Sequence, residues 1–311
     1  MAEKHLSHVA LFAGLGGAES ALNQAGIPNR TIAISENKGS HEGRQALQAY
    51  EAVLGKPPRN IGDITKVTDH TWDALHHIGI DLVTGGFPCQ PFSGLGARKG
   101  TKDPKWKPTL AMLRGLKLMK PKYILLENVA TLWQRHKPTV QWLIDQIEKM
   151  GYVSDVHVGN PVNVGYVQSR GRLYIAFSRE DVPKWTLPNL EGFDVKQKFV
   201  EERNADPDKF YTITAKRSPR RYDGTYFQCL CARSTDAHCK LMTWLDYKDG
   251  KARSYTPHEL FQLFGYANPR DLEFKRGVLS RSALAHAFGN SWHVGHASHL
   301  FSTLPPMEDQ P

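Results

Sequence analysis

The stretch that most constrains the fold runs from Asp81 to Gly96, with the sequence DLVTGGFPCQPFSGLG. It begins as an apolar run rich in β-forming residues and ends at two glycines, after which Cys89 lies between two prolines. In an open α/β sheet, loops that leave the carboxyl ends of strands gather ligands and chemistry. The prolines stiffen the backbone around Cys89, so its thiol can be held in one direction. A free cysteine is more often a small buried hydrophobe, and this stretch alone leaves both interpretations open.

Length and composition predict one large α/β domain with a modest insertion, or two small domains. The chain has 311 residues, 40% of them hydrophobic, which is compatible with a sizeable core. No apolar run approaches the roughly 18–20 residues of a membrane-spanning helix. The four cysteines do not suggest a disulfide framework, so we expect a cytoplasmic protein. By itself, the net charge of +9 favours a polyanionic partner of any kind.

The N-terminal segment predicts the first unit of a nucleotide-binding sheet. A buried strand over His8–Phe12 runs into a glycine-rich turn, and the helix that follows ends near Gly26. Such glycines let the backbone approach a ligand closely at a helix N-terminus. The turn is not a dinucleotide fingerprint, because Glu19 occupies the position of the third glycine.

Acidic side chains follow three further segments. Glu36 ends the strand expected over 31–35, Asp63 lies at the end of a third strand expected at Gly62–Thr65, and Glu127 follows the strand over 123–126. A carboxylate after the second strand can bind both hydroxyls of a ribose, although Glu36 could also be an ordinary surface glutamate. Asp63 could equally cap a helix. Burial at a strand end would raise the pKa of Glu127, which suits a proton donor.

The next elements are helices expected over 109–119 and 140–150, and strands over 155–159 and 173–177. Gln168, Arg170 and Arg172 lie between these two strands. Two arginines at alternating positions point to the same side of a strand, where they could grip a phosphate or a base oxygen. An ordinary surface pair has the same pattern.

Seven short motifs occur in the order FAGLGG, ISEN, GDIT, GGFPCQ, LLENV, QSRGR and FGNSW across nearly the whole chain. Together they resemble the DNA (cytosine-5)-methyltransferase family. The resemblance implies an α/β fold class: a Rossmann-like, S-adenosylmethionine-dependent sheet with helices on both faces, plus a small irregular target-recognition region. It also implies methyl transfer to carbon 5 of a cytosine that is flipped out of double-stranded DNA.

The resemblance assigns roles to residues of this chain. The catalytic residues would be Cys89, Glu127, Arg170 and Arg172. The cofactor S-adenosylmethionine would be bound by Phe12, Ala13, Gly14, Leu15, Gly16, Gly17, Glu36, Asn37, Asp63, Ile64, Gly86, Pro88, Leu110, Asn290, Ser291 and Trp292. The DNA-binding residues would be Gln90, Ser93, Arg98, Gln168, Arg217, Arg220 and Arg221. No residue is expected to bind a metal.

Three positions depart from the family pattern. Asn37 stands where the family usually has an aromatic or apolar residue against the adenine, and Trp292 stands where it generally has valine. The segment Asp103–Pro108 replaces the family's acidic–x–arginine–glycine run. We therefore expect changed contacts in the cofactor site and around the catalytic loop.

The chain is expected to divide into three parts. A catalytic α/β domain would cover 1–182, a target-recognition region 183–250, and a C-terminal segment returning to the catalytic domain 251–311. The division rests on the loss of a helical pattern after Val182 and on the basic cluster Lys216–Tyr222.

Two groups of residues could suggest a metal. Structural zinc sites generally use better-separated pairs than the cluster in the middle part, which consists of Cys229, Cys231, His238 and Cys239. Three histidines recur at helical spacing near the C-terminus, and for these we favour a helix face over a metal site: His293, His296 and His299.

Two other functions stay open at the level of sequence. The same fold and cysteine chemistry can methylate cytosine in tRNA, where shape can replace base readout. A non-catalytic DNA-binding relative is the second, although pure binding needs no nucleophile such as Cys89. Under the main hypothesis we expect a monomer that acts on double-stranded DNA, with no membrane partner. A cognate restriction endonuclease acting on the same site would be a further partner.

Overall fold

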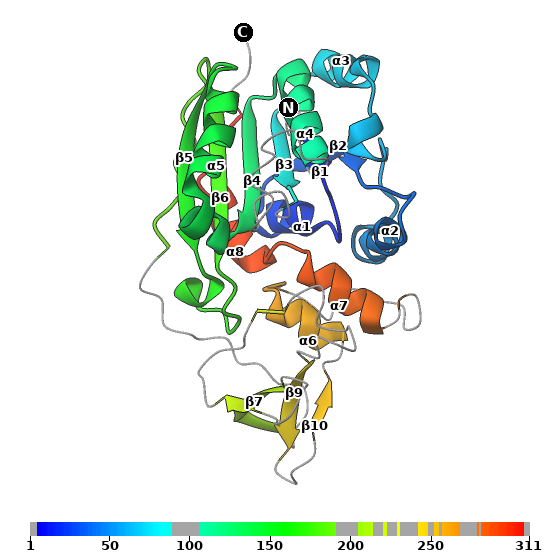
Figure 1. Cartoon of the computed structure of the whole chain (residues 1–311), viewed down its shortest axis with the longest axis vertical. Coiled ribbons are helices and arrows are strands. Elements are labelled where there is room, and N and C mark those ends of the chain that lie inside the picture. Colours follow the sequence, from blue (N-terminus) through cyan, green and yellow to red (C-terminus); the bar gives the residue numbers. More distant parts are fainter. Residues whose placement is uncertain are drawn as a thin grey trace.

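A computed structural model of the chain describes residues 5–88, 106–190, 205–213, 220–222, 229–230, 242–247, 252–254, 257–267, 279 and 281–307. The main body is a six-stranded mixed sheet with strand order β2-β1-β3-β4-β6-β5 (Figure 1). Its strands are β1 (Leu6–Leu11), β2 (Asn29–Ser35), β3 (Leu82–Gly86), β4 (Tyr123–Val129), β5 (Tyr152–Gly159) and β6 (Arg172–Arg179).

The pairing of the strands collects their carboxyl ends at one edge. β2, β1, β3 and β4 are parallel, whereas β6 runs antiparallel to both β4 and β5. Phe12, Glu36, Gly86 and Glu127 therefore meet at the same edge of the sheet, and Gly86 pairs directly with Glu127. The arrangement confirms the predicted α/β class.

Helices cover both faces of this sheet. One face, called the apolar face below, packs against α3 (Asp69–Ile78), α4 (Lys107–Met119) and α5 (Ala130–Glu148). The other, called the α1–α8 face, packs against α1 (Gly17–Gln24) and α8 (Val294–Phe301), with α6 (Pro257–Leu263) and α7 (Arg281–Gly289) beside them. The helix α2 (His41–Leu54) places Tyr50 against Ala10 and Ile34. None of the helices among the described residues is long and apolar enough to cross a membrane.

Two elements differ from the sequence prediction. The third strand expected to end at Gly62–Thr65 is reduced to an isolated parallel bridge between Asn60 and Ile34. After it, Asp63 Oδ1 accepts the backbone N–H of Thr65 at 3.0 Å and begins a short 3-10 helix, η1 (Ile64–Lys66). Such a side-chain cap competes with extended pairing. Helix α5 begins at Ala130 rather than at residue 140, with non-helical backbone angles at His136 just before Pro138. The proline interrupts the helical pattern in the sequence, which hides the first turns.

The region after Val182 is more regular than expected. A second, antiparallel sheet has the order β10-β9-β7-β8, formed by β7 (Ala205–Ile213), β8 (Arg220–Tyr222), β9 (Met242–Tyr247) and β10 (Ala252–Ser254). Figure 1 shows it beyond α6, at the end of the molecule away from the N-terminus. β10 lies past residue 250 yet pairs with β9, whereas Trp185 and Leu187 pack into the core of the α1–α8 face. The sheet is therefore displaced from the predicted 183–250 boundaries.

Candidate active site

The turn after β1 has a backbone that only certain residues adopt easily. Gly14 and Gly16 have φ of 57° and 83°, in the left-handed region where glycine has no steric cost. Phe12 also has a positive φ, 55°, which is uncommon for a residue with a side chain. At Gly17, an added Cβ would lie 2.7 Å from Ser291 Oγ, so the C-terminal segment packs directly on the start of α1.

Glu36 closes this turn from the end of β2. Its Oε2 accepts the N–H of Gly14 at 2.9 Å, and its Oε1 accepts the N–H of Asn37 at 3.1 Å. Burial raises the pKa of the Glu36 carboxyl, and the two backbone N–H groups oppose that effect. A carboxylate has about four acceptor sites, so after these two bonds it can still accept bonds from two neighbouring hydroxyls.

A residue that the sequence analysis missed, Asn60, holds Glu36 in place. Asn60 Oδ1 accepts the N–H of Glu36 at 3.1 Å, and Asn60 Nδ2 donates to the carbonyl oxygen of Glu36 at 3.1 Å. Nearby, Asn37 Nδ2 donates to Asp63 Oδ2 at 3.4 Å. The structure thus brings together the predicted residues Glu36, Asn37 and Asp63. An asparagine two residues before Gly62 gave no motif signal of its own.

A cavity of about 410 Å³ lies between η1, α3 and α4. It includes two predicted cofactor residues, Ile64 and Leu110, which therefore face one space from different elements. The remaining lining residues are Thr65, Val67, Trp72, Lys107, Ala111 and Arg114. The cavity has apolar walls with two basic side chains at its α4 side.

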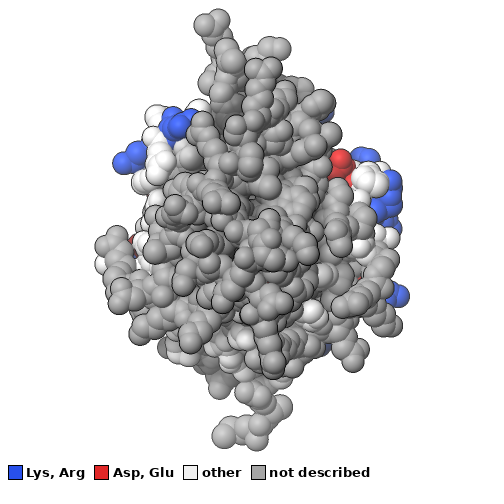
Figure 2. All heavy atoms as spheres, turned by 90° about the horizontal axis from the view of Figure 1, so that it is seen from below, with Lys and Arg blue, Asp and Glu red and all other residues white. Residues whose placement is uncertain are grey.

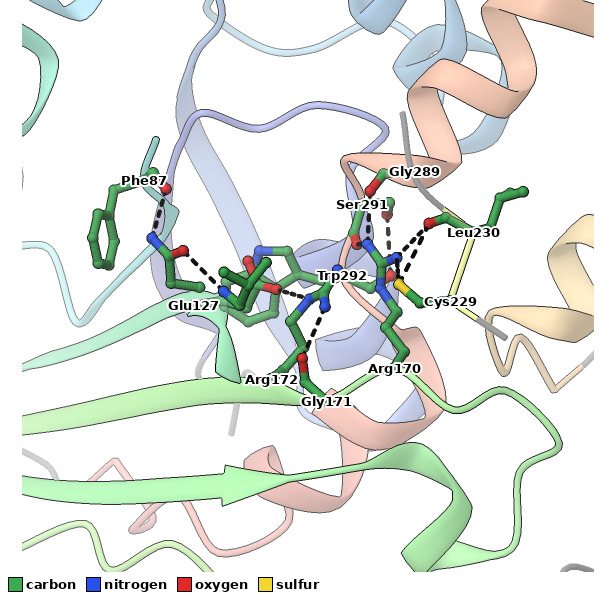
Figure 3. Close-up of polar contacts among 12 residues, drawn as sticks. Phe87, Glu127, Arg170, Gly171, Arg172, Cys229, Leu230, Gly289, Ser291 and Trp292 are labelled. Carbon is green, nitrogen blue, oxygen red and sulfur yellow. Dashed lines mark hydrogen bonds and ion pairs between the residues drawn. The ribbon is translucent and has the colours of Figure 1, made fainter. Parts of the chain in front are cut away.

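Glu127 and Arg172 form a buried ion pair at the carboxyl end of β4. Arg172 Nε lies 2.6 Å from Glu127 Oε1, and Figure 3 shows the two side chains pointing toward each other from β6 and β4. Burial raises the pKa of the Glu127 carboxyl, and the positive charges of Arg172 and Arg170 partly oppose it. The predicted raised pKa at this strand end therefore agrees with the structure, and so does its physical cause.

Because Gly86 has no side chain, the Glu127 and Trp292 side chains approach β3 closely there. A Cβ added at Gly86 would lie 3.3 Å from Glu127 Oε2 and 3.1 Å from Trp292 Nε1. The second carboxylate oxygen of Glu127 and the indole N–H of Trp292 thus flank the same point on β3. Pro88, the last described residue before Cys89, follows two positions later in the sequence.

The chain matches the family model described as C-5 cytosine-specific DNA methylase over residues 6–207. It belongs to this family. Type II methyltransferase M.BsuFI of Bacillus subtilis is 32% identical over 311 residues, which cover 92% of this chain and 69% of that protein.

The chain is also similar to a phage methyltransferase and to a methyltransferase of known structure. The orphan methyltransferase M.SPRI of Bacillus phage SPR is 31% identical over 195 residues, covering 61% of this chain and 42% of the phage protein, so the match spans less than half of that relative. The crystal structure of the Dnmt2 methyltransferase of S. pombe has the same fold, with a TM-score of 0.71 and 22% identity. It covers 97% of this chain and 98% of that one.

The C-terminal motif of this methylase chain places a large side chain in the site. The Trp292 ring lies parallel to the Phe301 ring, with centroids 6.4 Å apart, and meets the Tyr174 ring edge-on at 5.8 Å. Ser291 is buried beside Gly17, whereas Asn290 is exposed. Where this family generally has valine, the tryptophan thus lies between the glycine-rich turn at Gly17 and the Glu127 region at Gly86.

Arg170 differs from its predicted role around the target base. All its terminal N–H groups face protein acceptors, on Cys229, Leu230, Gly289 and Ser291, and its side chain is buried. Gln168, predicted to contact DNA, is also fully buried.

The remaining predicted catalytic and DNA-contacting residues fall into two groups. Arg220 and Arg221 lie on β8. The nucleophile and four predicted DNA contacts fall outside the described residues: Cys89, Gln90, Ser93, Arg98 and Arg217.

Neither metal candidate gains support. Within the described ranges no cluster of histidine, cysteine or acidic residues could hold a metal ion. His293 instead caps α8, because its side chain accepts the N–H of His296 at 3.1 Å. Of the four potential zinc ligands, Cys231, His238 and Cys239 lie outside the described residues.

Proposed function

We propose that this chain is an S-adenosylmethionine-dependent DNA (cytosine-5)-methyltransferase. The observation that carries the proposal is the buried pair of Glu127 and Arg172, which lies beside Gly86, three positions before Cys89 in the sequence. Membership in the methylase family supports the same activity. Retention of a nucleophile and an acid at these positions favours an enzyme over a pure binding protein.

The chemistry needs a nucleophile, because carbon 5 of cytosine does not take a methyl group unaided. In our proposal the Cys89 thiolate forms a bond to carbon 6, while Glu127 in its acid form donates a proton to ring nitrogen 3. The ring is then an enamine that is nucleophilic at carbon 5. Burial favours the protonated form of Glu127 before this step, and Arg172 stabilises the carboxylate that remains after it.

The cycle closes by releasing the thiolate. A base removes the proton from carbon 5 after methylation, the electron pair re-forms the ring double bond, and the sulfur–carbon bond breaks. S-adenosylmethionine, when bound, supplies the electrophilic methyl group. The target carbon is inside a duplex, so the cytosine must first be flipped out of the stack.

The residues at the edge of the sheet fit the cofactor. Glu36 has acceptor capacity for the ribose hydroxyls, and Asp63 Oδ2 can accept the amino group of the adenine. Ser291 packs closely on Gly17, so the C-terminal segment lies beside the glycine-rich turn that would hold the methionine end. We propose these residues, together with Ile64 and Leu110, as the cofactor site.

The partner in this proposal is double-stranded DNA. The net charge is +9, and Figure 2 shows Lys and Arg side chains on both flanks of the face seen from below, with little acidic surface among the described residues. Basic surface supplies sequence-independent affinity for phosphates. The sheet β7–β10 would belong to the recognition region, and Arg220 and Arg221 on β8 would be available to it. We further propose a monomer, with a restriction endonuclease of the same specificity as its functional partner.

The decisive experiment is methyl transfer from tritiated S-adenosylmethionine to unmethylated duplex DNA and, in parallel, to tRNA. Digestion to nucleosides locates the label, which is expected in 5-methyldeoxycytidine. Label only in tRNA would make the protein an RNA methyltransferase, and no label despite cofactor binding would favour a non-catalytic binding protein. Cys89→Ser should abolish transfer while DNA binding is retained. A covalent adduct with DNA containing 5-fluorocytosine should form only with the wild-type thiol.

A further inference from the structure

The buried Arg170 side chain donates hydrogen bonds from both of its terminal nitrogens, whereas its Nε has no hydrogen-bond partner among the described residues. Nη1 donates to the carbonyl oxygen of Leu230 at 2.8 Å and to Cys229 Sγ at 3.3 Å. Nη2 donates to the carbonyl oxygens of Ser291 at 2.7 Å and Gly289 at 2.9 Å. The side chain is 1% exposed (Figure 3). The four terminal N–H groups are thus committed to protein acceptors, which leaves none for a phosphate or a base.

The acceptors come from two distant parts of the chain. Leu230 lies 60 positions after Arg170, between β8 and β9, and Gly289 lies 119 positions after it, at the end of α7. The planar guanidinium group of Arg170 has several donors in a fixed arrangement and can bind two pairs of acceptors at once. The single ammonium group of a lysine could not replace it. The ring of Phe264 lies against the guanidinium, 4.9 Å from its central carbon.

The two segments that accept hydrogen bonds from Arg170 each adjoin a part of the molecule to which we assign a function. Ser291, on the C-terminal side, packs against Gly17 at the start of the cofactor turn. The segment of Cys229 and Leu230, on the other side, belongs to the region of the second sheet, which we assign to DNA recognition. None of the four hydrogen bonds of Arg170 involves Glu127 or Arg172, which pair with each other.

We propose that Arg170 is a positioning residue that couples the seating of the recognition region to the binding of the cofactor. The inference rests on the proposed function, because it needs both DNA and S-adenosylmethionine as ligands. DNA that holds the recognition region in place presents Leu230 to Arg170, and Arg170 then fixes Ser291 against the cofactor turn. Linkage makes the effect reciprocal, so the cofactor strengthens DNA binding by the same factor.

The test measures that factor directly. Equilibrium dialysis gives the affinity for tritiated S-adenosylhomocysteine, which cannot be turned over, with and without an excess of sheared unmethylated genomic DNA. The ratio of the two dissociation constants is the coupling factor, and we expect roughly 5-fold or more for the wild type. Arg170→Lys keeps the charge but loses the fork, so its ratio should fall toward 1.

Two variants separate coupling from general damage. Arg179→Lys changes an arginine at the last position of β6, where it pairs with Asp181 away from the site, and should keep the wild-type ratio. Cys229→Ala removes one acceptor while the carbonyl of Leu230 stays, and should lower the ratio to an intermediate value. Thermal unfolding of each variant shows whether it is folded, and a purely structural role would weaken both affinities without changing their ratio.

The outcomes distinguish the inference from the proposed function. A folded Arg170→Lys protein with the wild-type ratio would overturn the coupling role, and so would a wild-type ratio of 1. If Arg170→Lys fails to fold, Cys229→Ala decides, and an unchanged ratio there would overturn the inference. A wild-type protein that binds neither ligand would instead refute the proposed function, and the inference would fall with it.

Discussion

The two faces of the six-stranded sheet bury different kinds of side chain. On the apolar face, β3, β4 and β6 direct aliphatic and aromatic residues against α3, α4 and α5. On the α1–α8 face, alternate residues of β1, β3, β4 and β6 are often polar, and the buried ones include His8, Thr84, Glu127, Arg172, Tyr174 and Ser178. The strands thus serve as scaffold on one side and as site on the other.

The difference shows which face of the sheet carries the free-energy cost of burying polar groups. A buried polar group without a partner is expensive, whereas apolar burial stabilises. Among the described residues on the α1–α8 side, those with buried polar atoms that have no hydrogen bond by geometry include Glu19, Tyr174 and His296. We infer that the apolar face supplies the stability that lets the opposite face hold charged and polar groups.

The largest effect is expected from Glu127→Gln on the polar side. The amide keeps the shape but cannot donate an acid proton to the base, so methyl transfer should fall by roughly 10²–10⁴-fold. Single-turnover transfer from tritiated S-adenosylmethionine measures the loss. Affinity for S-adenosylhomocysteine should stay unchanged. A variant with the wild-type rate would remove Glu127 from the chemistry.

On the apolar face, Leu143→Ala should affect stability instead of chemistry. Leu143 is fully buried in α5, and the cavity left behind should cost about 2–5 kcal/mol of the free energy of unfolding. Urea unfolding followed by tryptophan fluorescence checks this. Gln141→Ala, on the exposed side of the same helix, is the matched control and should change little. If folded Leu143→Ala protein lost cofactor affinity, the separation of the two faces would fail.

A pH-dependent effect is expected from Glu19→Gln. Burial raises the pKa of the Glu19 carboxyl to about 7, from 4.5 in the unfolded chain. Because the folded state holds the proton more tightly, this stabilising contribution is complete below pH 4.5 and is lost as the pH rises through 7. The variant should therefore gain on the wild type by up to ~3 kcal/mol between pH 4.5 and 8.

The measurement is the difference between the two unfolding free energies at each pH. This difference isolates Glu19 from the buried histidines. Burial lowers the pKa of both His8 and His296 to about 3, so their contribution is lost as the pH falls below 6.5, in the opposite direction. A stability difference that stayed constant from pH 5 to 8 would show that Glu19 titrates normally.

The smallest effect is expected from Tyr174→Phe. The Tyr174 hydroxyl is buried and, among the described residues, has no hydrogen-bond partner. Removing such a group should leave stability unchanged or raise it by ~1 kcal/mol, as a thermal melt would show. Methyl transfer should also persist. A large loss of transfer would mean that the hydroxyl contacts the reacting groups, which would move Tyr174 into the site.

Much of the fold follows from local sequence signals. Strand ends with glycine or acidic residues placed Gly14, Glu36, Gly86 and Glu127 at one edge, because parallel strands end on the same side. The strand expected to end at Gly62–Thr65 is only an isolated bridge at Asn60, because the Asp63 side chain caps a turn directly after it. The competition between a strand and a capped turn depends here on a side-chain hydrogen bond, which the pattern of apolar residues does not encode.

The candidate site was predicted less completely, because its contacts are distant in sequence. Arg170 was expected near a phosphate or base oxygen on the strength of the strand alternation alone. Its acceptors, Leu230 and Gly289, are backbone carbonyls, which any residue type supplies, so no motif announces them. Asn60 was not predicted for a related reason, because its side chain hydrogen-bonds the backbone of Glu36.

The hydrogen bonds of Asn128 have a mechanical consequence. Its Nδ2 donates to the carbonyl oxygen of Phe87 at 2.9 Å, and its Oδ1 accepts the N–H of Val129 at 2.8 Å. The end of β4 thereby clamps the chain one residue before Pro88. Phe87 is thus a fixed point two positions before Cys89, held to the same strand that carries Glu127.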